Sequence, residues 1–198
     1  MFTSEKKDLN GITLLDSRSR IRNDFLKLWF RNAIDGIRFY AMMGRLTQAP
    51  IIGSSIKKSL YLYYRYIHTN SIILPLEDIE EILQNANDIY VEPCPCRLAE
   101  GEELCEAPLF TCMRINHSAT IRKEQKQDRG ITPQEAIEIA RNANRHGLVM
   151  SLESCIQPYQ NNICMCCTDC CVAMKMRYKY QVPIYHFGPY IPESKIEG

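Results

Sequence analysis

The sequence predicts a mostly α-helical fold with short β-strands, in which a helical scaffold carries a cysteine-rich, loop-built region. Two observations favour this class: apolar residues recur at helical spacing over several segments, and all ten cysteines follow residue 93. The 198 residues suffice for one domain with its own core. Because 24 basic side chains nearly balance 23 acidic ones, no nucleic-acid partner is expected.

Three regions are predicted along the chain. Residues 1–70 form an N-terminal helical region for packing or docking, residues 71–180 form the cysteine-rich region, and residues 181–198 form an extended tail. No low-complexity linker separates them. We therefore expect them to share one core.

The N-terminal region shows two helical patterns. Apolar residues at helical spacing predict one long amphipathic helix over 20–45. A tyrosine-rich helix over 56–69 follows a break at Pro50 and Gly53. Such a wide apolar face favours core packing, and docking on a partner subunit or at a membrane surface remains the alternative.

The middle of the chain has clearer signals. A helix after Pro75 and a short strand over 89–91 lead to the first cysteines. Thr132 is expected to form a capping box with Glu135, and Gly147 supplies the left-handed stop of the same helix. An extended segment from 148 to 152 then leads to the later cysteines.

The number of cysteines favours metal or redox chemistry. The polar N-terminus lacks the apolar run of a secretory signal, so we expect a reducing, cytoplasmic location, with membrane association only through a partner. Structural disulfides are uncommon in such compartments. A disulfide scaffold is the weaker alternative, because such scaffolds are usually short secreted chains.

The first cysteine group lies in a stretch, 93–130, that is predicted to be irregular, with a loop or short polar helix near its end. Its members are Cys94, Cys96, Cys105 and Cys112. Pro93 and Pro95 favour an extended backbone, which would point Cys94 and Cys96 to the same side. Four such thiolates suit either a zinc ion or an iron-sulfur cluster.

The second group places five cysteines within eight residues: Cys164, Cys166, Cys167, Cys170 and Cys171. Adjacent side chains normally diverge, so these thiols are not expected to bind one metal centre together. We expect this segment to supply thiolates to more than one cluster. Cys155 stands apart, and a buried, non-ligating role suits it better.

The combined motifs resemble those of 4Fe-4S-binding, ferredoxin-like proteins of anaerobic bacteria and archaea. The resemblance covers about residues 72–175 and consists of C-P-C-R, the C-x6-C of the first group, the helix EAIEIARNANRHGLV and C-x-C-C-x-x-C-C. It implies one or two 4Fe-4S clusters, bound by the nine cysteines of the two groups, and electron transfer. The ferredoxin module that usually follows is absent here, which implies an electron carrier on another protein. Met165 and Asp169 replace the usual Asn and Gly.

Arg97 directly follows the C-P-C motif. Its guanidinium is expected either to bind cluster sulfur and tune its potential, or to lie at the surface beside Glu100, Glu102 or Glu103. We expect an iron-sulfur protein that transfers single electrons as a redox subunit or as the partner of a larger complex. The alternatives are an enzyme with a catalytic cluster, for example in reductive sulfur-bond cleavage, and a zinc-stabilised interaction module.

Overall fold

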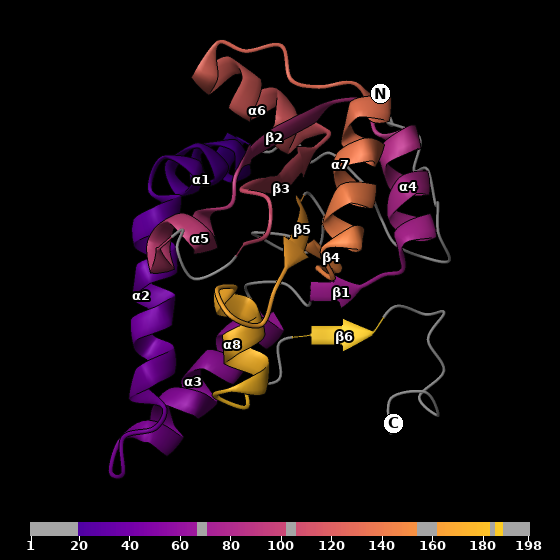
Figure 1. The fold of residues 1–198 in the computed structure, drawn as a ribbon. Coiled ribbons are helices and arrows are strands. Elements are labelled where there is room, and N and C mark those ends of the chain that lie inside the picture. Colours follow the sequence, from indigo (N-terminus) through magenta and orange to yellow (C-terminus); the bar gives the residue numbers. More distant parts are fainter. Residues whose placement is uncertain (1–19, 67–70, 102–105, 154–161, 183–184, 188–198) are drawn as a thin grey trace.

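The computed structural model describes residues 20–66, 71–101, 106–153, 162–182 and 185–187, which are coloured in Figure 1. This part of the chain is mostly α-helical with short strands. Its helices are α1 (Arg20–Arg31), α2 (Ala33–Leu46), α3 (Gly53–Tyr66), α4 (Leu76–Asn85), α5 (Pro95–Glu100), α6 (His117–Lys126), α7 (Pro133–Arg145) and α8 (Val172–Tyr178). Its strands are β1 (Ser71–Ile73), β2 (Ile89–Pro93), β3 (Phe110–Ile115), β4 (Val149–Glu153), β5 (Asn162–Cys166) and β6 (Tyr185–Phe187).

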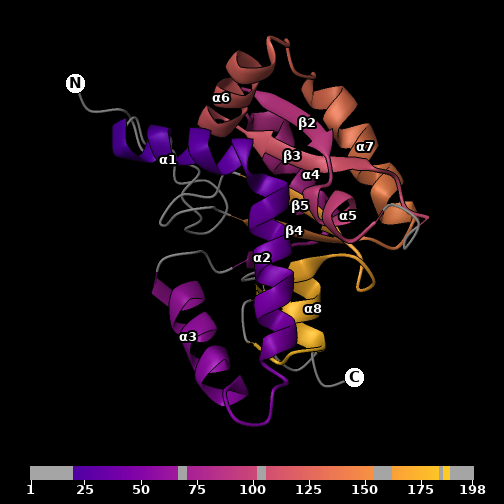
Figure 2. The same cartoon turned by 90° about the vertical axis from the view of Figure 1, so that its left-hand side faces the viewer.

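The predicted single helix over 20–45 is wrong, because two helices meet at Asn32. The backbone of Asn32 leaves the helical region at φ −112° and ψ 20°. Its side-chain amide donates to the Leu28 carbonyl at 2.9 Å, which gives this carbonyl of the last turn of α1 a hydrogen-bond partner. Figure 2 shows α1 and α2 running in clearly different directions. None of the helices in the described residues has the length and apolar character needed to cross a bilayer.

Local sequence signals predicted α7 and β4 correctly. Thr132 accepts a hydrogen bond from the backbone of Glu135, whose carboxylate binds the Thr132 backbone in return, which completes the capping box. Gly147 has φ 72°, a conformation that costs glycine little. The helix after Pro75 and the strand beginning at Ile89 are likewise confirmed.

The prediction that 93–130 is irregular is wrong for the part that forms α5 and β3, whereas α6 agrees with the short polar helix expected near the end of this stretch. The strands form one sheet in the order β2-β3-β5-β4-β1-β6. All neighbours are antiparallel except β1 and β6, which run parallel. The predicted extended tail thus contributes one strand to the sheet, and residues 188–198 lie outside the described part.

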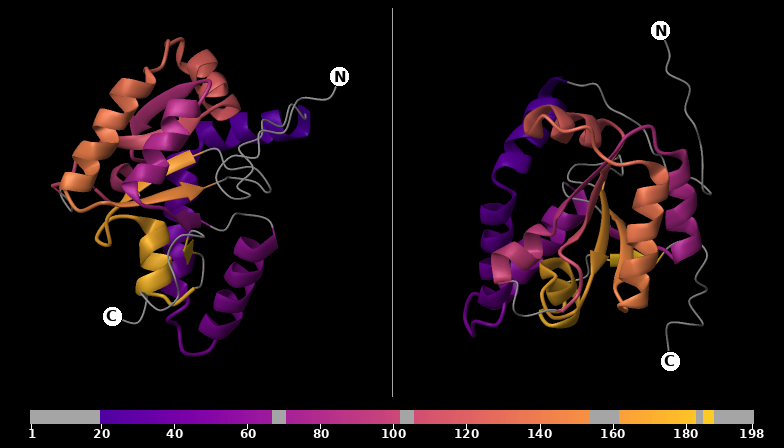
Figure 3. Two further views of the ribbon diagram at one scale, coloured as in Figure 1. Left: turned by 90° about the vertical axis from the view of Figure 1, so that its right-hand side faces the viewer. Right: turned by 45° about the horizontal axis from the view of Figure 1, so that its top comes forward.

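The two faces of the sheet bury different kinds of side chain. One face is apolar: Met113, Met150, Leu152, Ile163 and Met165 pack with α4 and α7. Because side chains alternate along a strand, the residues between them point to the opposite face. Those residues are Cys112, Arg114, Ser151, Glu153, Asn162, Cys164 and Cys166. Figure 3 shows α4 and α7 on one side of the sheet and α2 and α8 on the other.

Three elements are tied together next to the second face of the sheet. Glu100, at the end of α5, accepts hydrogen bonds from Arg45 of α2 at 3.3 Å and from Lys175 of α8 at 2.6 Å. The Glu100 carboxylate is only 11% exposed. This contact holds α5, which contains Cys96, and α8, which directly follows Cys171, against α2.

Candidate functional site

Six thiols surround one cavity of about 90 Å³ between the polar face of the sheet and the helices that cover it. They lie on β3 and β5, in α5, and at the N-cap positions of α5 and α8. The six residues are Cys94, Cys96, Cys112, Cys164, Cys166 and Cys171. Trp29, Ile37 and Tyr40 of α1 and α2 also line the cavity. The predicted cysteine-rich region is therefore built on strands and helix starts rather than on loops.

Strand register positions the thiols of the sheet. Cys112 of β3 lies directly opposite Cys164 of β5. Cys164 and Cys166 are two residues apart on β5 and therefore face the same side. Asn162, two residues earlier, lines the same cavity. The alternating sequence of β5, NICMC, thus presents an amide and two thiols to one face and Ile163 and Met165 to the other.

The remaining three thiols lie where helices begin. Cys94 is the N-cap residue of α5, Cys96 lies in its first turn, and Cys171 is the N-cap residue of α8. Pro95 occupies the first turn of α5, where its fixed φ and missing N–H are tolerated. The predicted extended backbone is therefore confirmed at Pro93 and Cys94 and wrong from Pro95 onward, yet Cys94 and Cys96 still line the same cavity.

The six sulfur atoms form a continuous run of contacts. The Sγ atoms of Cys166 and Cys171 are 3.1 Å apart. Cys96 is hydrogen-bonded with both Cys171 and Cys94, and Cys166 is hydrogen-bonded with Cys164. On the other side, the Cys112 thiol donates to Cys164. Thiols that are distant in sequence therefore share one hydrogen-bonded network.

Two of these thiols favour the thiolate form. Hydrogen bonding with Cys166 and Cys96, together with the backbone N–H groups of Met174 and Ala173, holds the pKa of Cys171 well below its usual range. A hydrogen bond from Cys96, helped by the backbone N–H of Arg97, lowers the pKa of Cys94 to about 7.

The pKa values of the other four thiols are raised. Hydrogen bonding with Cys164 and burial raise the pKa of Cys112, and hydrogen bonding with Cys171 and Cys94, together with burial, raises the pKa of Cys96. Cys164 and Cys166 each accept one hydrogen bond, which favours the thiolate. A second hydrogen bond of each, together with burial, nevertheless raises its pKa. Among these six thiols, the pKa is therefore lowered at Cys94 and Cys171 and raised at the others.

Arg97 is buried, so the predicted surface alternative is wrong. Its guanidinium is only 2% exposed and donates to the Pro108 carbonyl and to Thr111 Oγ1. Glu100 pairs with other residues, and Glu102 and Glu103 lie outside the described residues. Arg97 therefore brings a buried positive charge close to Cys94, whose thiolate it favours.

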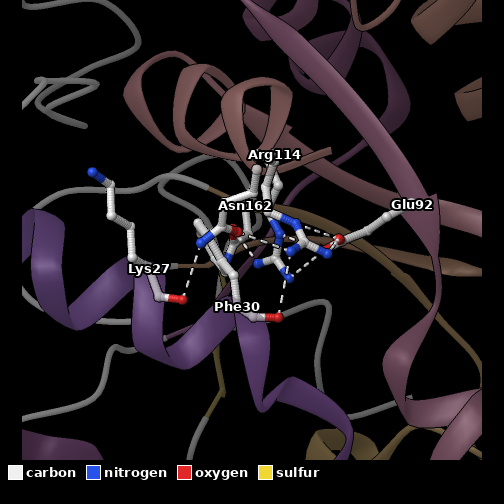
Figure 4. Close-up of polar contacts among 7 residues, drawn as sticks. Lys27, Phe30, Glu92, Arg114 and Asn162 are labelled. Carbon is white, nitrogen blue, oxygen red and sulfur yellow. Dashed lines mark hydrogen bonds and ion pairs between the residues drawn. The ribbon is translucent and has the colours of Figure 1, made fainter. Parts of the chain in front are cut away.

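A second buried cation lies beside the sheet thiols. Arg114 of β3 donates to Glu92 of β2 at 2.6 Å and to Asn162 of β5 at 2.5 Å (Figure 4). Arg122 of α6 binds the other oxygen of the Glu92 carboxylate. The aromatic ring of Phe30 lies 4.6 Å from the Arg114 guanidinium carbon. Two guanidiniums therefore share one carboxylate, which leaves a net positive charge next to the cavity.

Glu153 is a cavity residue that sequence reasoning missed. It follows the apolar residues of β4 and lines the cavity with the thiols. Burial, reinforced by the nearby Cys171 thiolate, raises the pKa of the Glu153 carboxyl. Ser151 donates to this carboxyl at 3.0 Å. Strand alternation could have identified Glu153, because it occupies the same face of β4 as Ser151.

The structure separates the other predicted ligands from this cavity. Cys167 packs against the apolar core that includes α4 and α7, whereas the preceding Cys166 packs with α2 and α8. The Sγ atoms of Cys167 and Cys170 lie 2.8 Å apart. Cys105 and Cys155 lie outside the described residues, so their predicted roles stay predictions.

The donor set suits a thiolate-ligated metal group, although no metal geometry is already formed. Among the described residues, no group of three or more His, Cys, Asp or Glu side chains is arranged to hold a metal ion. Two thiolates on a tetrahedral zinc ion, with bonds of 2.3 Å, lie about 3.8 Å apart. Cys166 and Cys171, at 3.1 Å, would have to separate by roughly 0.7 Å to share such an ion. Six thiols around one cavity provide more than the four ligands that zinc or an iron-sulfur cluster needs.

Comparison with known proteins does not test the resemblance of the motifs to cluster-binding proteins. Comparisons of this chain with family models, curated proteins and solved structures found no significant match.

Proposed function

We propose that the protein binds an iron-sulfur cluster of the 4Fe-4S type in the thiol-lined cavity and transfers single electrons. The observation that carries this proposal is the convergence of six thiols from β3, β5 and the starts of α5 and α8 on one cavity. Four cysteine thiolates hold such a cluster, which supplies the one-electron chemistry when bound. The two remaining thiols can act as hydrogen-bond donors to its sulfur atoms.

The surroundings of the cavity support this function over a purely structural metal site. A group held by four thiolates is an anion, and buried negative charge needs compensation. Arg97 and Arg114 provide buried positive charge near the thiols. Trp29 and Tyr40 line the cavity from the helix side, where they limit access of water. Charge, hydrogen bonding and burial are the means by which a protein sets a cluster potential.

A redox partner protein or a larger complex would supply and accept the electrons. The surface best suited to docking it is the end of the α2–α3 hairpin, at the bottom of Figure 2. Ile51 is 91% exposed there, with Ile52 and Met42 also exposed nearby. Exposed apolar groups of this kind are typical of interaction sites. Replacing Ile51 with serine should release the protein from a complex in the source extract, as measured by native mass, while the iron content stays unchanged.

Neighbouring cysteines provide a matched test of the cluster site. Cys166→Ser and Cys167→Ser make the same chemical change one residue apart, yet only Cys166 lines the cavity. After oxygen-free purification, we expect the Cys166→Ser protein to lose iron and acid-labile sulfide, because serine binds iron more weakly than thiolate does. The Cys167→Ser protein should retain both.

Two results would contradict this assignment. Equal, undiminished iron and sulfide in Cys166→Ser and Cys164→Ser would exclude these thiols as ligands. Stoichiometric zinc without sulfide in the wild-type protein would favour the zinc-stabilised interaction module. Circular dichroism of each variant shows whether the fold is intact, so that loss of iron is not confused with unfolding.

A further inference from the structure

Cys167 and Cys170 form a dithiol pair outside the cavity. The two residues belong to one turn, Cys167–Thr168–Asp169–Cys170, between β5 and α8. The Cys171 backbone N–H donates to the Cys167 carbonyl at 3.3 Å, which closes the turn. The two sulfur atoms are 2.8 Å apart, about 0.8 Å more than the length of a disulfide bond. The turn thus holds these thiols almost in position to be joined.

The two thiols differ in their access to solvent. Cys167 is partly exposed and lines a groove of about 520 Å³ together with Thr168 and Asp169. The groove is also lined by His146 and Leu148, which follow α7. Cys170 is 1% exposed and does not line this groove. A reagent in this groove can therefore reach Cys167 directly, whereas Cys170 is shielded from solvent.

We propose that Cys167 and Cys170 are a two-electron redox centre that reduces small organic disulfides by thiol–disulfide exchange. Cys167 attacks one sulfur of the disulfide RSSR, forms a mixed disulfide with it and releases RSH. Cys170 then attacks the Cys167 sulfur, forms the Cys167–Cys170 disulfide and releases the second RSH. Two S–H bonds and one external S–S bond are exchanged for one internal S–S bond and two RSH molecules, so two electrons pass to the substrate.

This proposal does not depend on the cluster. Oxidised glutathione, added without oxygen to the full-length protein, is the probe, and peptide mass spectrometry after alkylation locates each product. We expect the wild-type protein to gain a Cys167–Cys170 disulfide and no stable adduct. Thr168→Ala, a control within the same turn that keeps both thiols, should behave in the same way.

The two serine variants should respond differently. In Cys170→Ser the resolving thiol is missing, so a glutathione adduct should accumulate at Cys167. In Cys167→Ser the remaining thiol is buried, so Cys170 should gain at least tenfold less adduct over the same time. Iron and sulfide should stay at the wild-type level in both variants.

Three outcomes would overturn the proposal. The first is a wild-type protein that forms no Cys167–Cys170 disulfide with excess oxidised glutathione. The second is a disulfide from Cys167 to Cys105 instead. The third is loss of iron from Cys167→Ser and Cys170→Ser to the level of Cys166→Ser, which would make both residues cluster ligands while leaving the cluster proposal intact.

Discussion

The buried charges around Glu92 provide a quantitative test of the fold beside the cavity. Glu92 accepts hydrogen bonds from Arg114 at 2.6 Å and from Arg122 at 2.8 Å. The three side chains are between 4% and 11% exposed. Glu92→Gln keeps the size of the side chain but removes the only negative charge that these two arginines share in the described structure. Both guanidiniums would then be buried without a carboxylate.

Breaking a buried ion pair in this way costs about 3–5 kcal/mol. Total stabilities are about 5–15 kcal/mol, so the loss should be a large fraction of the free energy of unfolding. Urea denaturation can be followed by fluorescence of Trp29, the only tryptophan, which packs against the apolar cluster that contains Phe30. Glu80→Gln is the matched control, because the Glu80–Arg141 pair lies at the surface and should contribute far less. A loss below about 1 kcal/mol for Glu92→Gln, the range of exposed pairs, would refute this reasoning.

Two further predictions concern pH and packing. Burial alone would raise the pKa of Glu92, but Arg114 and Arg122 lower it below the usual 4.5. The stabilisation by Glu92 is therefore complete above pH 4.5 and is lost as the pH falls through the folded-state pKa. In acid denaturation, the difference in free energy of unfolding between wild type and Glu92→Gln should therefore narrow below pH 4.5. A difference that stays constant with pH would contradict the lowered pKa of Glu92. Gly44→Ala places a Cβ 2.6 Å from the buried Tyr180 ring and should lower the free energy of unfolding by about 1–3 kcal/mol in urea. A more stable variant, as expected for an exposed helical glycine, would show that α2 and Tyr180 do not pack as described.

Features with local causes could be predicted from the sequence. The capping box of Thr132 and Glu135 and the stop at Gly147 depend on residues within one turn, and α7 lies where they place it. The break at Asn32 was missed because the apolar pattern continues through it. The Asn32 side chain ends α1 by its hydrogen bond to Leu28, and the apolar pattern does not reveal this bond.

The sheet could not be predicted, because its pairings join distant residues. Cys112 and Cys164 lie opposite each other across 52 positions of sequence, and only the register of β3 with β5 brings them together. β5 was hidden among crowded cysteines, although NICMC alternates as a strand does. The burial of Arg97 is also non-local, because it depends on Pro108 and Thr111.

The separation of Cys166 from Cys167 follows from elementary geometry. Adjacent side chains at the end of a strand diverge, so the two thiols were not expected to bind one centre together. The structure places Cys166 with the cavity thiols and Cys167 with Cys170. Which centre each of them serves remains a prediction for the paired serine variants.

The central claim is that cavity thiols hold iron and inorganic sulfide that can accept one electron. The most direct measurement is a reductive titration of oxygen-free wild-type protein, followed by paramagnetic resonance, with iron and acid-labile sulfide determined on the same sample. We predict iron and sulfide in equal amounts and a paramagnetic signal that grows as one electron per cluster is added. A colourless protein that contains only zinc, or no metal, and gives no signal at any potential would contradict the claim.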